Sequence, residues 1–157
     1  MDKSLVMIIE DEVSINDALS EAVKMGNYDV VQAYDGKEAL DLLIQKNIDP
    51  VLVLCDMNMP VMGGIEFIKQ SLIKNMDLNI CVITANDDKD SLVELLQLGV
   101  TDYISKPFKI EALIEKLKLM VDIGKRKNLI KQQLNENTAA NKSIKFNNLL
   151  KLKKNQK

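Results

Sequence analysis

The sequence predicts an α/β fold in which a doubly wound, five-stranded parallel sheet is covered by helices on both faces. Apolar runs of strand length alternate with segments whose apolar residues recur every three or four positions, and the connections between them are short. The run Val51–Cys55 is apolar throughout, which is typical of a strand that has helices on both sides. Four of the apolar runs end in polar residues that could form one site.

The strands are predicted from short apolar runs bounded by polar or turn-forming residues. The third run is the most apolar and is expected at the centre of the sheet. The five predicted strands are Leu5–Ile9, a short strand near Val30–Ala33, Val51–Cys55, Ile80–Thr84 and Asp102–Ser105.

The helices are predicted from apolar residues at helical spacing and from residues that start or stop helices. Ser14 is expected to cap the first helix and Gly26 to stop it, Asp35-Gly36 precedes the second, and Gly99 closes the fourth. The residues expected to face the core are, helix by helix, Ile15, Ala18, Leu19, Ala22 and Val23; Ala39, Leu40, Leu43 and Ile44; Ile65, Ile68, Leu72 and Ile73; Leu92, Leu95, Leu96 and Leu98; and Ile110, Leu113, Ile114 and Leu117.

Polar side chains of complementary type follow four of the strands. Glu10-Asp11-Glu12 follows the first, Asp56 the third, Thr84 ends the fourth, and Lys106 comes soon after the fifth. In an open parallel sheet, ligands bind beyond the carboxyl ends of the strands. An acidic group, a carboxylate, a hydroxyl and an ammonium at that edge suit a divalent metal ion and a phosphoryl group.

These blocks give the chain a recognisable pattern. The pair Glu10-Asp11, the segment Asp56-Met-Asn-Met-Pro-Val-Met-Gly-Gly64, the pair Thr84-Ala85 and the segment Asp102-Tyr-Ile-Ser-Lys-Pro-Phe108 occur in this order. Together they resemble a response-regulator receiver domain of two-component signalling, in the CheY-like superfamily. The resemblance covers roughly residues 4 to 122. It implies a flavodoxin-like sheet with strand order 2-1-3-4-5.

The resemblance also implies a phosphorylation site. Asp56 would accept a phosphoryl group from a sensor histidine kinase or a phosphotransfer protein. Mg²⁺ would be held by the carboxylates of Asp11 and Asp56 and the backbone carbonyl of Asn58, with Glu10 in an indirect or water-mediated contact. Lys106 would contact a phosphoryl oxygen as a point charge. Pro60, Gly64 and Pro107 would form the adjoining turns, with a cis bond between Lys106 and Pro107.

A conformational switch follows from the same resemblance. Thr84 would bind the phosphoryl group and move toward it, and Tyr103 would then turn inward. The face formed by the fourth helix, fifth strand and fifth helix would change its affinity for partners. Asn58 and Asn86 stand where members of the family tune the rate of dephosphorylation. The expected role is regulatory and not that of an enzyme.

Composition narrows the class of protein. No apolar run approaches the roughly 20 residues of a membrane span, and the N-terminus lacks the features of a signal peptide. Cys55 and Cys81 lie in apolar strand runs and are expected to be reduced core residues, so we expect a cytoplasmic protein. The chain has no histidine, which excludes imidazole chemistry of its own.

Charge divides the chain into two parts. Residues 1–123 contain 11 Lys or Arg and 22 Asp or Glu, a net charge of −11, whereas residues 124–157 contain 10 and one, a net charge of +9. We therefore expect a receiver domain over 1–123 and a basic extension or linker, helical in part, over 124–157.

Two other classes of protein share part of this pattern. A haloacid-dehalogenase-type phosphatase also has an Asp nucleophile after a buried strand and uses magnesium, but it needs a second Asp two residues later, where this chain has Asn58. A pseudo-receiver that is never phosphorylated usually lacks a metal carboxylate or the lysine, and this chain retains both.

The output of the domain is open between three hypotheses. The chain is a stand-alone receiver that binds a partner or forms a homodimer, or it is the receiver portion of a longer regulator and ends in a helical linker. In the third hypothesis, the basic tail binds nucleic acid or another anionic surface, with Ile144 to Leu152 as a weakly amphipathic segment. Leu117, Met120 and Val121 could continue a dimer seam through Leu129, Ile130 and Leu134, but Gly124 interrupts this seam. A solvated, partly disordered tail is the simplest alternative.

Overall fold

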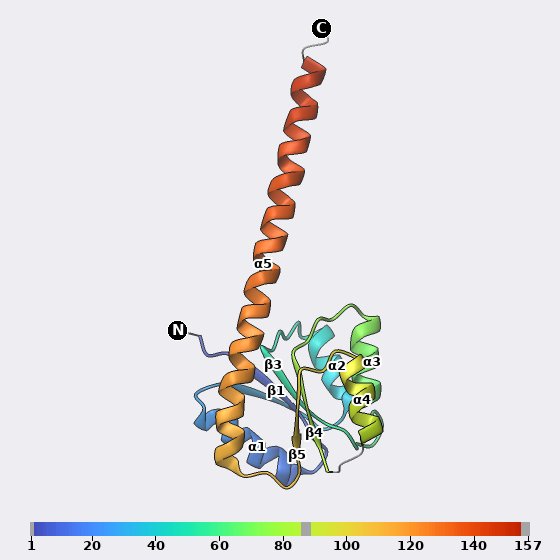
Figure 1. Ribbon diagram of the computed structural model, residues 1–157, viewed down its shortest axis with the longest axis vertical. Coiled ribbons are helices and arrows are strands. Elements are labelled where there is room, and N and C mark those ends of the chain that lie inside the picture. Colours follow the sequence, from blue (N-terminus) through green and yellow to red (C-terminus); the bar gives the residue numbers. More distant parts are fainter. Residues whose placement is uncertain (1, 86–88, 155–157) are drawn as a thin grey trace. The chain divides into compact units, whose positions relative to one another are not determined.

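A five-stranded parallel sheet forms the centre of the chain, with strand order β2-β1-β3-β4-β5 (Figure 1). The computed structural model describes residues 2–85 and 89–154, with side chains described for 2–85 and 90–148. The predicted fold class and strand order are confirmed. The strands are β1 Leu5–Ile9, β2 Asp29–Ala33, β3 Leu52–Asp56, β4 Ile80–Thr84 and β5 Asp102–Ser105.

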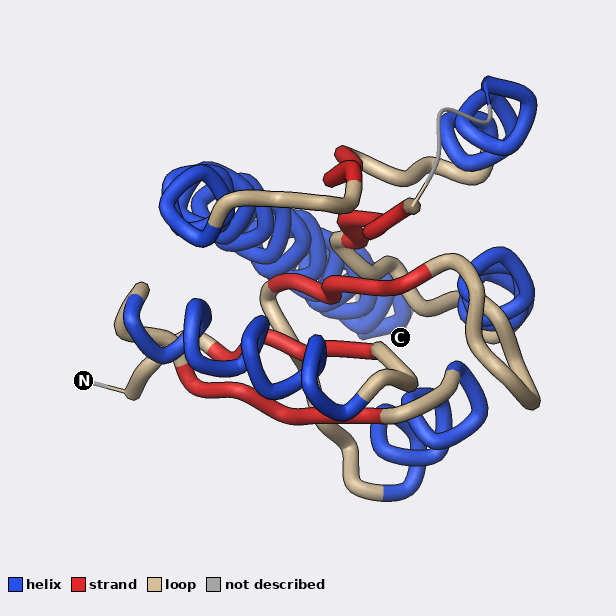
Figure 2. The backbone as a smooth tube through the Cα atoms, turned by 90° about the horizontal axis from the view of Figure 1, so that it is seen from below, coloured by secondary structure: helices blue, strands red, loops and turns tan. Residues whose placement is uncertain are grey.

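Helices cover both faces of the sheet, because alternate residues of each strand point to opposite sides. The helices α1 and the first part of α5 lie on one face of the sheet, and α2, α3 and α4 lie on the other (Figures 1 and 2). Their apolar side chains form one core on each face. Cys81 belongs to the first of these two cores and Cys55 to the second, and both are free thiols. The helices are α1 Val13–Met25, α2 Gly36–Gln45, α3 Gly64–Ile73, α4 Lys89–Gln97 and α5 Ile110–Lys154.

Local sequence determines where the first two helices begin and end. Asp35 caps α2 by accepting a hydrogen bond of 2.9 Å from the backbone N–H of Glu38. The prediction that Ser14 caps α1 is wrong, because the cap position is Glu12 and Ser14 lies inside the first turn. Helix α1 does end before Gly26, but the residue in the left-handed conformation is Asn27, with φ of 64°.

Several apolar residues expected in the core lie at the surface instead. Ala18, Ile44, Leu72, Ile73 and Leu96 are exposed. In α3 the buried residues are Gly64, Phe67, Ile68 and Ser71, which recur at the period of a helix. The predicted set for α3 mixed this face with the neighbouring one, since apolar residues occur on both.

Gly124 is a point of close packing and does not interrupt a helix. Residues Met1–Gly124 form one compact unit and Lys125–Lys157 a second, and α5 contributes residues to both. A Cβ at Gly124 would overlap the carbonyl oxygen of Val51 and approach Nδ2 of Asn79 to 2.8 Å. Helix α5 continues through Gly124, and the expectation that Gly124 interrupts a dimer seam stays a prediction. A glycine here lets the helix backbone approach the amino end of β3.

The second unit is helical over residues 125–154, including the polar stretch from Asn135 to Ser143. Its exposed apolar side chains include Leu129, Ile130 and Leu134. Within the described part of the chain, no helix combines the length and apolar character needed to cross a membrane.

Candidate functional site

The carboxyl ends of neighbouring strands bring four predicted site residues together. Asp56 is the last residue of β3 and Thr84 the last of β4, while Glu10 directly follows β1 and Lys106 directly follows β5. Because the order of these strands is β1-β3-β4-β5, their ends form one continuous edge of the sheet. The chain folds this way because each strand is long enough to cross the core and ends where its sequence becomes polar.

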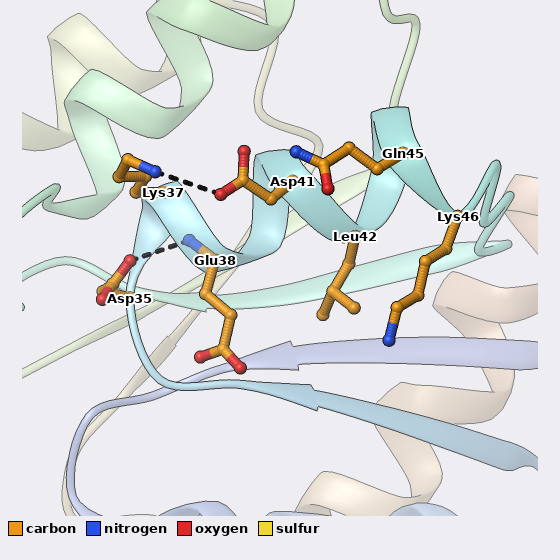
Figure 3. A pocket seen from close by; sticks show the side chains of 7 residues that line it. All are labelled: Asp35, Lys37, Glu38, Asp41, Leu42, Gln45 and Lys46. Carbon is orange, nitrogen blue, oxygen red and sulfur yellow. Dashed lines mark hydrogen bonds and ion pairs between the residues drawn. The ribbon is translucent and has the colours of Figure 1, made fainter.

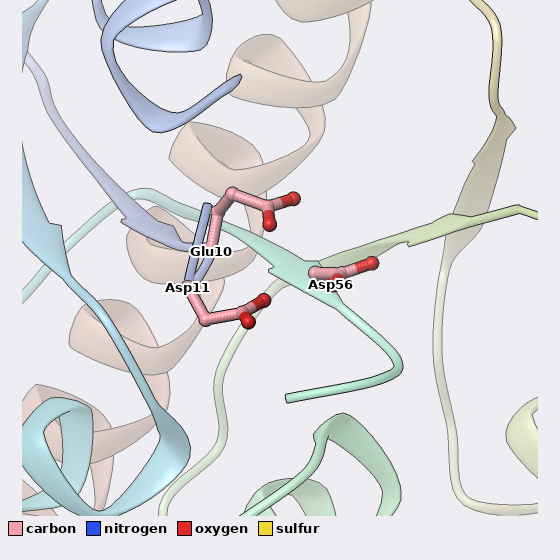
Figure 4. Close-up of side chains that lie close together, drawn as sticks. All are labelled: Glu10, Asp11 and Asp56. Atoms are coloured by element: carbon pink, nitrogen blue, oxygen red, sulfur yellow. The ribbon is translucent and has the colours of Figure 1, made fainter. Parts of the chain in front are cut away.

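Three carboxyl groups gather at the ends of β1 and β3 (Figure 4). One oxygen from each of Glu10, Asp11 and Asp56 can be chosen so that all lie within 4.8 Å of one another. Glu10 and Asp56 are buried and Asp11 is exposed, so the group opens to solvent on one side. Like charges this close repel one another, and a hard divalent cation such as Mg²⁺ prefers oxygen ligands of this kind. The three residues fit such an ion.

Lys106 supplies the positive charge opposite these acids. Its Nζ lies 2.9 Å from Oε2 of Glu10 and 3.3 Å from Oδ1 of Asp56. Its backbone N–H donates a 2.7 Å hydrogen bond to the carbonyl of Thr84, which continues the pairing of β4 with β5. The Lys106–Pro107 peptide bond is cis, as expected.

Burial and charge act in opposite directions on these groups. Burial raises the pKa of the Glu10 carboxyl above its ordinary value, and the hydrogen bond from Lys106 opposes this. Burial likewise raises the pKa of Asp56, against the nearby Lys106 charge. Burial alone would lower the pKa of Lys106, but its hydrogen bond to Glu10 and the charge of Asp56 outweigh burial and raise that pKa. Lys106 therefore stays cationic and partly compensates two buried carboxylates.

The backbone around Glu10 is held by a residue that sequence reasoning missed. Asn16, on α1, is fully buried, and its side-chain amide donates a 2.8 Å hydrogen bond to the carbonyl of Glu10. The signal was present in the spacing, because Asn16 stands three residues before Leu19 and seven before Val23, which are on the buried face of the helix. A polar residue on that face has to satisfy its hydrogen bonds inside the protein.

The turn after β3 depends on close backbone approach. Gly64 donates a 3.0 Å hydrogen bond from its N–H to the carbonyl of Met57, and a Cβ at this position would lie 2.6 Å from the carbonyl oxygen of Asp56. Pro60 is exposed in the same turn, and its carbonyl accepts a 2.7 Å hydrogen bond from the N–H of Met62. Asn58 is exposed two residues after Asp56. Asn86, the other expected tuning position, lies outside the described residues.

Tyr103 points outward and is 45 % exposed. Lys116 holds this region from α5: its Nζ donates a 2.7 Å hydrogen bond to the carbonyl of Tyr103, pairs with Asp102 at 2.9 Å, and lies 5.7 Å from the centre of the Tyr103 ring. A surface cavity of about 400 Å³ is lined by Tyr103, Phe108 and Lys116 among others. Thr84 is only partly buried.

A second hollow, of about 290 Å³, lies along α2 (Figure 3). Charged side chains on its wall already interact with groups beside them, since Lys37 pairs with Asp41 at 3.1 Å and Asp35 caps the helix. None of the predicted site residues lines it.

A match to a known protein family covers the residues that form this site. Residues 6–118 match the family model described as the response regulator receiver domain. The chain belongs to this family. Receiver domains are regulatory modules of two-component signalling and not classical enzymes. They typically bind Mg²⁺ through acidic residues, and they interact in general with histidine kinases or phosphotransfer proteins.

Solved structures similar to this receiver domain come from several organisms. The receiver domain of the Francisella response regulator 1452 is 27 % identical, with a TM-score of 0.69, and the match covers 76 % of this chain and 97 % of that one. The Vibrio cholerae chemotaxis protein CheY4 is 28 % identical, with a TM-score of 0.69, and 75 % and 98 % of the two chains are covered. A CheY-like receiver protein from Methanospirillum hungatei JF-1, at 24 % identity and TM-score 0.73, shares the fold over 80 % of this chain and 99 % of that one.

Proposed function

We propose that Asp56 is the phosphoacceptor of this receiver domain. The observation that carries the proposal is the position of its carboxylate, which ends the buried strand β3, lies 3.3 Å from Nζ of Lys106 and is grouped with Glu10 and Asp11. Phosphoryl transfer depends mainly on positioning and on neutralising charge, and these neighbours serve both purposes.

In the proposed reaction, a carboxylate oxygen of Asp56 attacks the phosphorus of a phosphohistidine on a kinase or phosphotransfer protein. A new P–O bond forms, the P–N bond breaks, and its electron pair remains on the departing imidazole. The product is an acyl phosphate on Asp56. Lys106 would contact an oxygen of the transferred group, and Thr84 would bind another through its hydroxyl.

Glu10, Asp11 and Asp56, with the backbone carbonyl of Asn58, are the residues that would hold Mg²⁺. The ion would supply positive charge that offsets the crowded carboxylates and the phosphoryl oxygens. Glu10 is buried and already bonded to Lys106, whereas Asp11 is exposed. We therefore assign Glu10 the indirect contact and Asp11 the direct one.

The proposed signal is a population shift at the surface around Tyr103. When Thr84 moves toward the phosphoryl group, Tyr103 turns inward from its exposed position, and the face formed by α4, β5 and the first part of α5 changes its affinity for a partner or a second copy. Residues 1–123 carry this receiver activity, and residues 124–157 form a separate basic extension.

Intact-mass spectrometry of the whole chain after incubation with acetyl phosphate tests the proposal. A gain of one phosphoryl group is expected with magnesium, with none in EDTA and none in Asp56→Asn. The matched control is Asp41→Asn, a partly exposed aspartate on α2, which should be phosphorylated like the wild type. Phosphorylation of Asp56→Asn, or no adduct together with no binding of beryllofluoride to the wild type, would refute the assignment.

A second candidate function concerns the basic extension. Lys125, Arg126, Lys142 and Lys145 are exposed on the helix of the second unit, and residues 124–157 have a net charge of +9. Such a segment favours an anionic partner, and nucleic acid is the one that we would test first. Binding to DNA or RNA that weakens steeply with added salt, and that is lost in a chain lacking 125–157, is the expected result. Equal binding by both chains would exclude the extension.

A further inference from the structure

Asn16 is a fully buried polar residue that joins three segments near the acidic group. From α1, its Nδ2 donates to the carbonyl of Glu10 at 2.8 Å and to the carbonyl of Ala33 at 3.0 Å. Its Oδ1 accepts a 2.9 Å hydrogen bond from Nε2 of Gln32. Both amide hydrogens and one lone pair are therefore used, and the ends of β1 and β2 are tied to the helix.

The free-energy cost of burying an amide indicates that the hydrogen bonds of Asn16 have a purpose. An amide buried in a protein costs free energy unless its hydrogen bonds are made, and an apolar side chain of similar size would fill the same space beside Leu19 without that requirement. The bonds of Asn16 go to the carbonyl of the residue that follows β1 and to the carbonyl of the last residue of β2. The residue consequently fixes the direction in which the chain leaves the sheet.

The peptide that leaves β1 carries two of the three acids. The N–H of Glu10 donates to the carbonyl of Ala33 at 3.1 Å, so the carbonyl of Ala33 accepts from both Glu10 and Asn16. The side chain of Glu10 is bound as well, because its Oε1 accepts from the N–H of Glu12 at 3.1 Å. Asp11 alone among the acids is exposed, and its direction depends on the peptide that follows the Glu10 carbonyl.

We propose that Asn16 is a positioning residue for the metal site: by holding the carbonyl of Glu10, it directs the carboxylates of Glu10 and Asp11 toward Asp56 and so sets the affinity for Mg²⁺. This inference rests on the proposed function. Groups that orient metal ligands typically contribute about 10- to 100-fold to metal affinity, which is large enough to measure.

The chain contains a matched control at the opposite end of the sheet. Asn79 is also buried, and its Nδ2 donates to the carbonyls of Val51 at 3.1 Å and Met120 at 2.9 Å, while its Oδ1 accepts from the hydroxyl of Thr101 at 3.0 Å. Asn79 precedes β4 and therefore lies at the amino ends of the strands, away from the acids. It makes the same number of bonds as Asn16 with the same atoms.

The experiment compares Asn16→Ala with Asn79→Ala in the full chain. Mg²⁺ dissociation constants are measured by isothermal titration calorimetry, and thermal stability is measured in EDTA. Both variants should lose stability, since each removes three hydrogen bonds of a buried amide. Only Asn16→Ala should weaken Mg²⁺ binding, by about tenfold, and Asn79→Ala should bind within about twofold of the wild type.

Equal Mg²⁺ affinity in Asn16→Ala and the wild type would overturn the positioning role and leave the proposed function intact. Equal weakening in both variants would also overturn it, because general loss of stability would then explain the effect. If the wild type binds no Mg²⁺, the proposed function fails and this inference fails with it. If Asn16→Ala does not fold, Asn16→Leu, which fills the same space but has no donor for the Glu10 carbonyl, decides: weaker Mg²⁺ binding supports the role and unchanged binding overturns it.

Discussion

Nζ of Lys106 lies 2.9 Å from Oε2 of Glu10, a side chain that is only 1 % exposed. The lysine comes from the end of β5 and the glutamate from the end of β1, so the pair spans the carboxyl edge of the sheet. The same ammonium is 3.3 Å from Asp56. The ammonium of Lys106 thus lies close enough to stabilise two buried carboxylates.

Removing that charge should destabilise the chain most when no metal is present. Lys106→Met is expected to lower the free energy of unfolding by about 2 kcal/mol in EDTA, because two buried carboxylates lose their partner. Saturating Mg²⁺ should recover part of the loss. Urea unfolding followed by circular dichroism measures both quantities. Lys69→Met is the control, since Lys69 pairs with Glu94 at the surface and its loss should lower the free energy of unfolding much less.

Stability in EDTA should fall as pH rises above the ordinary carboxyl range. Burial raises the pKa of Glu10 above 4.5 and that of Asp56 above 3.8 in the folded chain. Between the unfolded and folded values the folded chain binds more protons, so this contribution is present below the ordinary values and is lost as pH rises through the raised ones. In Glu10→Gln, stability in EDTA should depend less steeply on pH. An equally steep curve in Glu10→Gln would show that another group is responsible.

Val61 should be a site at which a polar substitution stabilises the chain. Its φ is 65°, a conformation that β-branched residues rarely adopt, and its side chain is 79 % exposed. Val61→Asn is expected to raise the free energy of unfolding by about 1 kcal/mol, because asparagine tolerates the left-handed region. The control is Val93→Asn, at an exposed position inside α4, which should not raise the free energy of unfolding. A loss of stability in Val61→Asn would contradict the predicted strain.

Lys116 should hold Tyr103 in its outward position. Its ammonium binds the Tyr103 carbonyl at 2.7 Å and lies 5.7 Å from the centre of the ring, which favours the exposed conformation. Lys116→Met is expected to strengthen beryllofluoride binding about threefold, because the inward state then competes with a less stable outward one. Calorimetry measures the affinity, and the NMR shifts of the tyrosine ring report its position. Lys118→Met, exposed two residues further along α5, should leave both unchanged.

Gly124→Ala should destabilise the chain although alanine normally favours a helix by about 1 kcal/mol over glycine. The added Cβ would overlap the carbonyl oxygen of Val51 and crowd Asn79. A loss of about 2 kcal/mol is expected from thermal or urea unfolding. Asn135→Ala, at an exposed position of the same helix, should show the ordinary small gain. A higher free energy of unfolding in Gly124→Ala would mean that α5 and β3 can move apart at this point with little loss of stability.

The sequence predicted the parts of this structure that depend on local pattern. Apolar runs marked the strands, and polar residues at their ends marked the edge at which Glu10, Asp56 and Lys106 meet. Strand order came from the family resemblance, because alternation of strands and helices is compatible with several orders.

The sequence-based predictions that failed concern residues whose positions depend on tertiary contacts. Phe67 is buried while Leu72 and Ile73 are not, because the rotation of α3 is set by what it packs against. Asn16 was overlooked because its role lies in bonds to strands that are distant in the sequence. The close approach that requires glycine at position 124 is likewise a property of two segments and is invisible in either one alone.

Gly64 has a consequence for comparing sequences in this family. Any side chain there would meet the carbonyl oxygen of Asp56, so a substitution has to displace the backbone of the proposed phosphoacceptor before it alters any chemistry. In an evolutionary comparison, an unchanging glycine at this position would look like a functional residue. Its conservation would reflect only the lack of space between two segments of main chain. A protein lineage that replaces Gly64 should also change the turn from Met57 to Gly63.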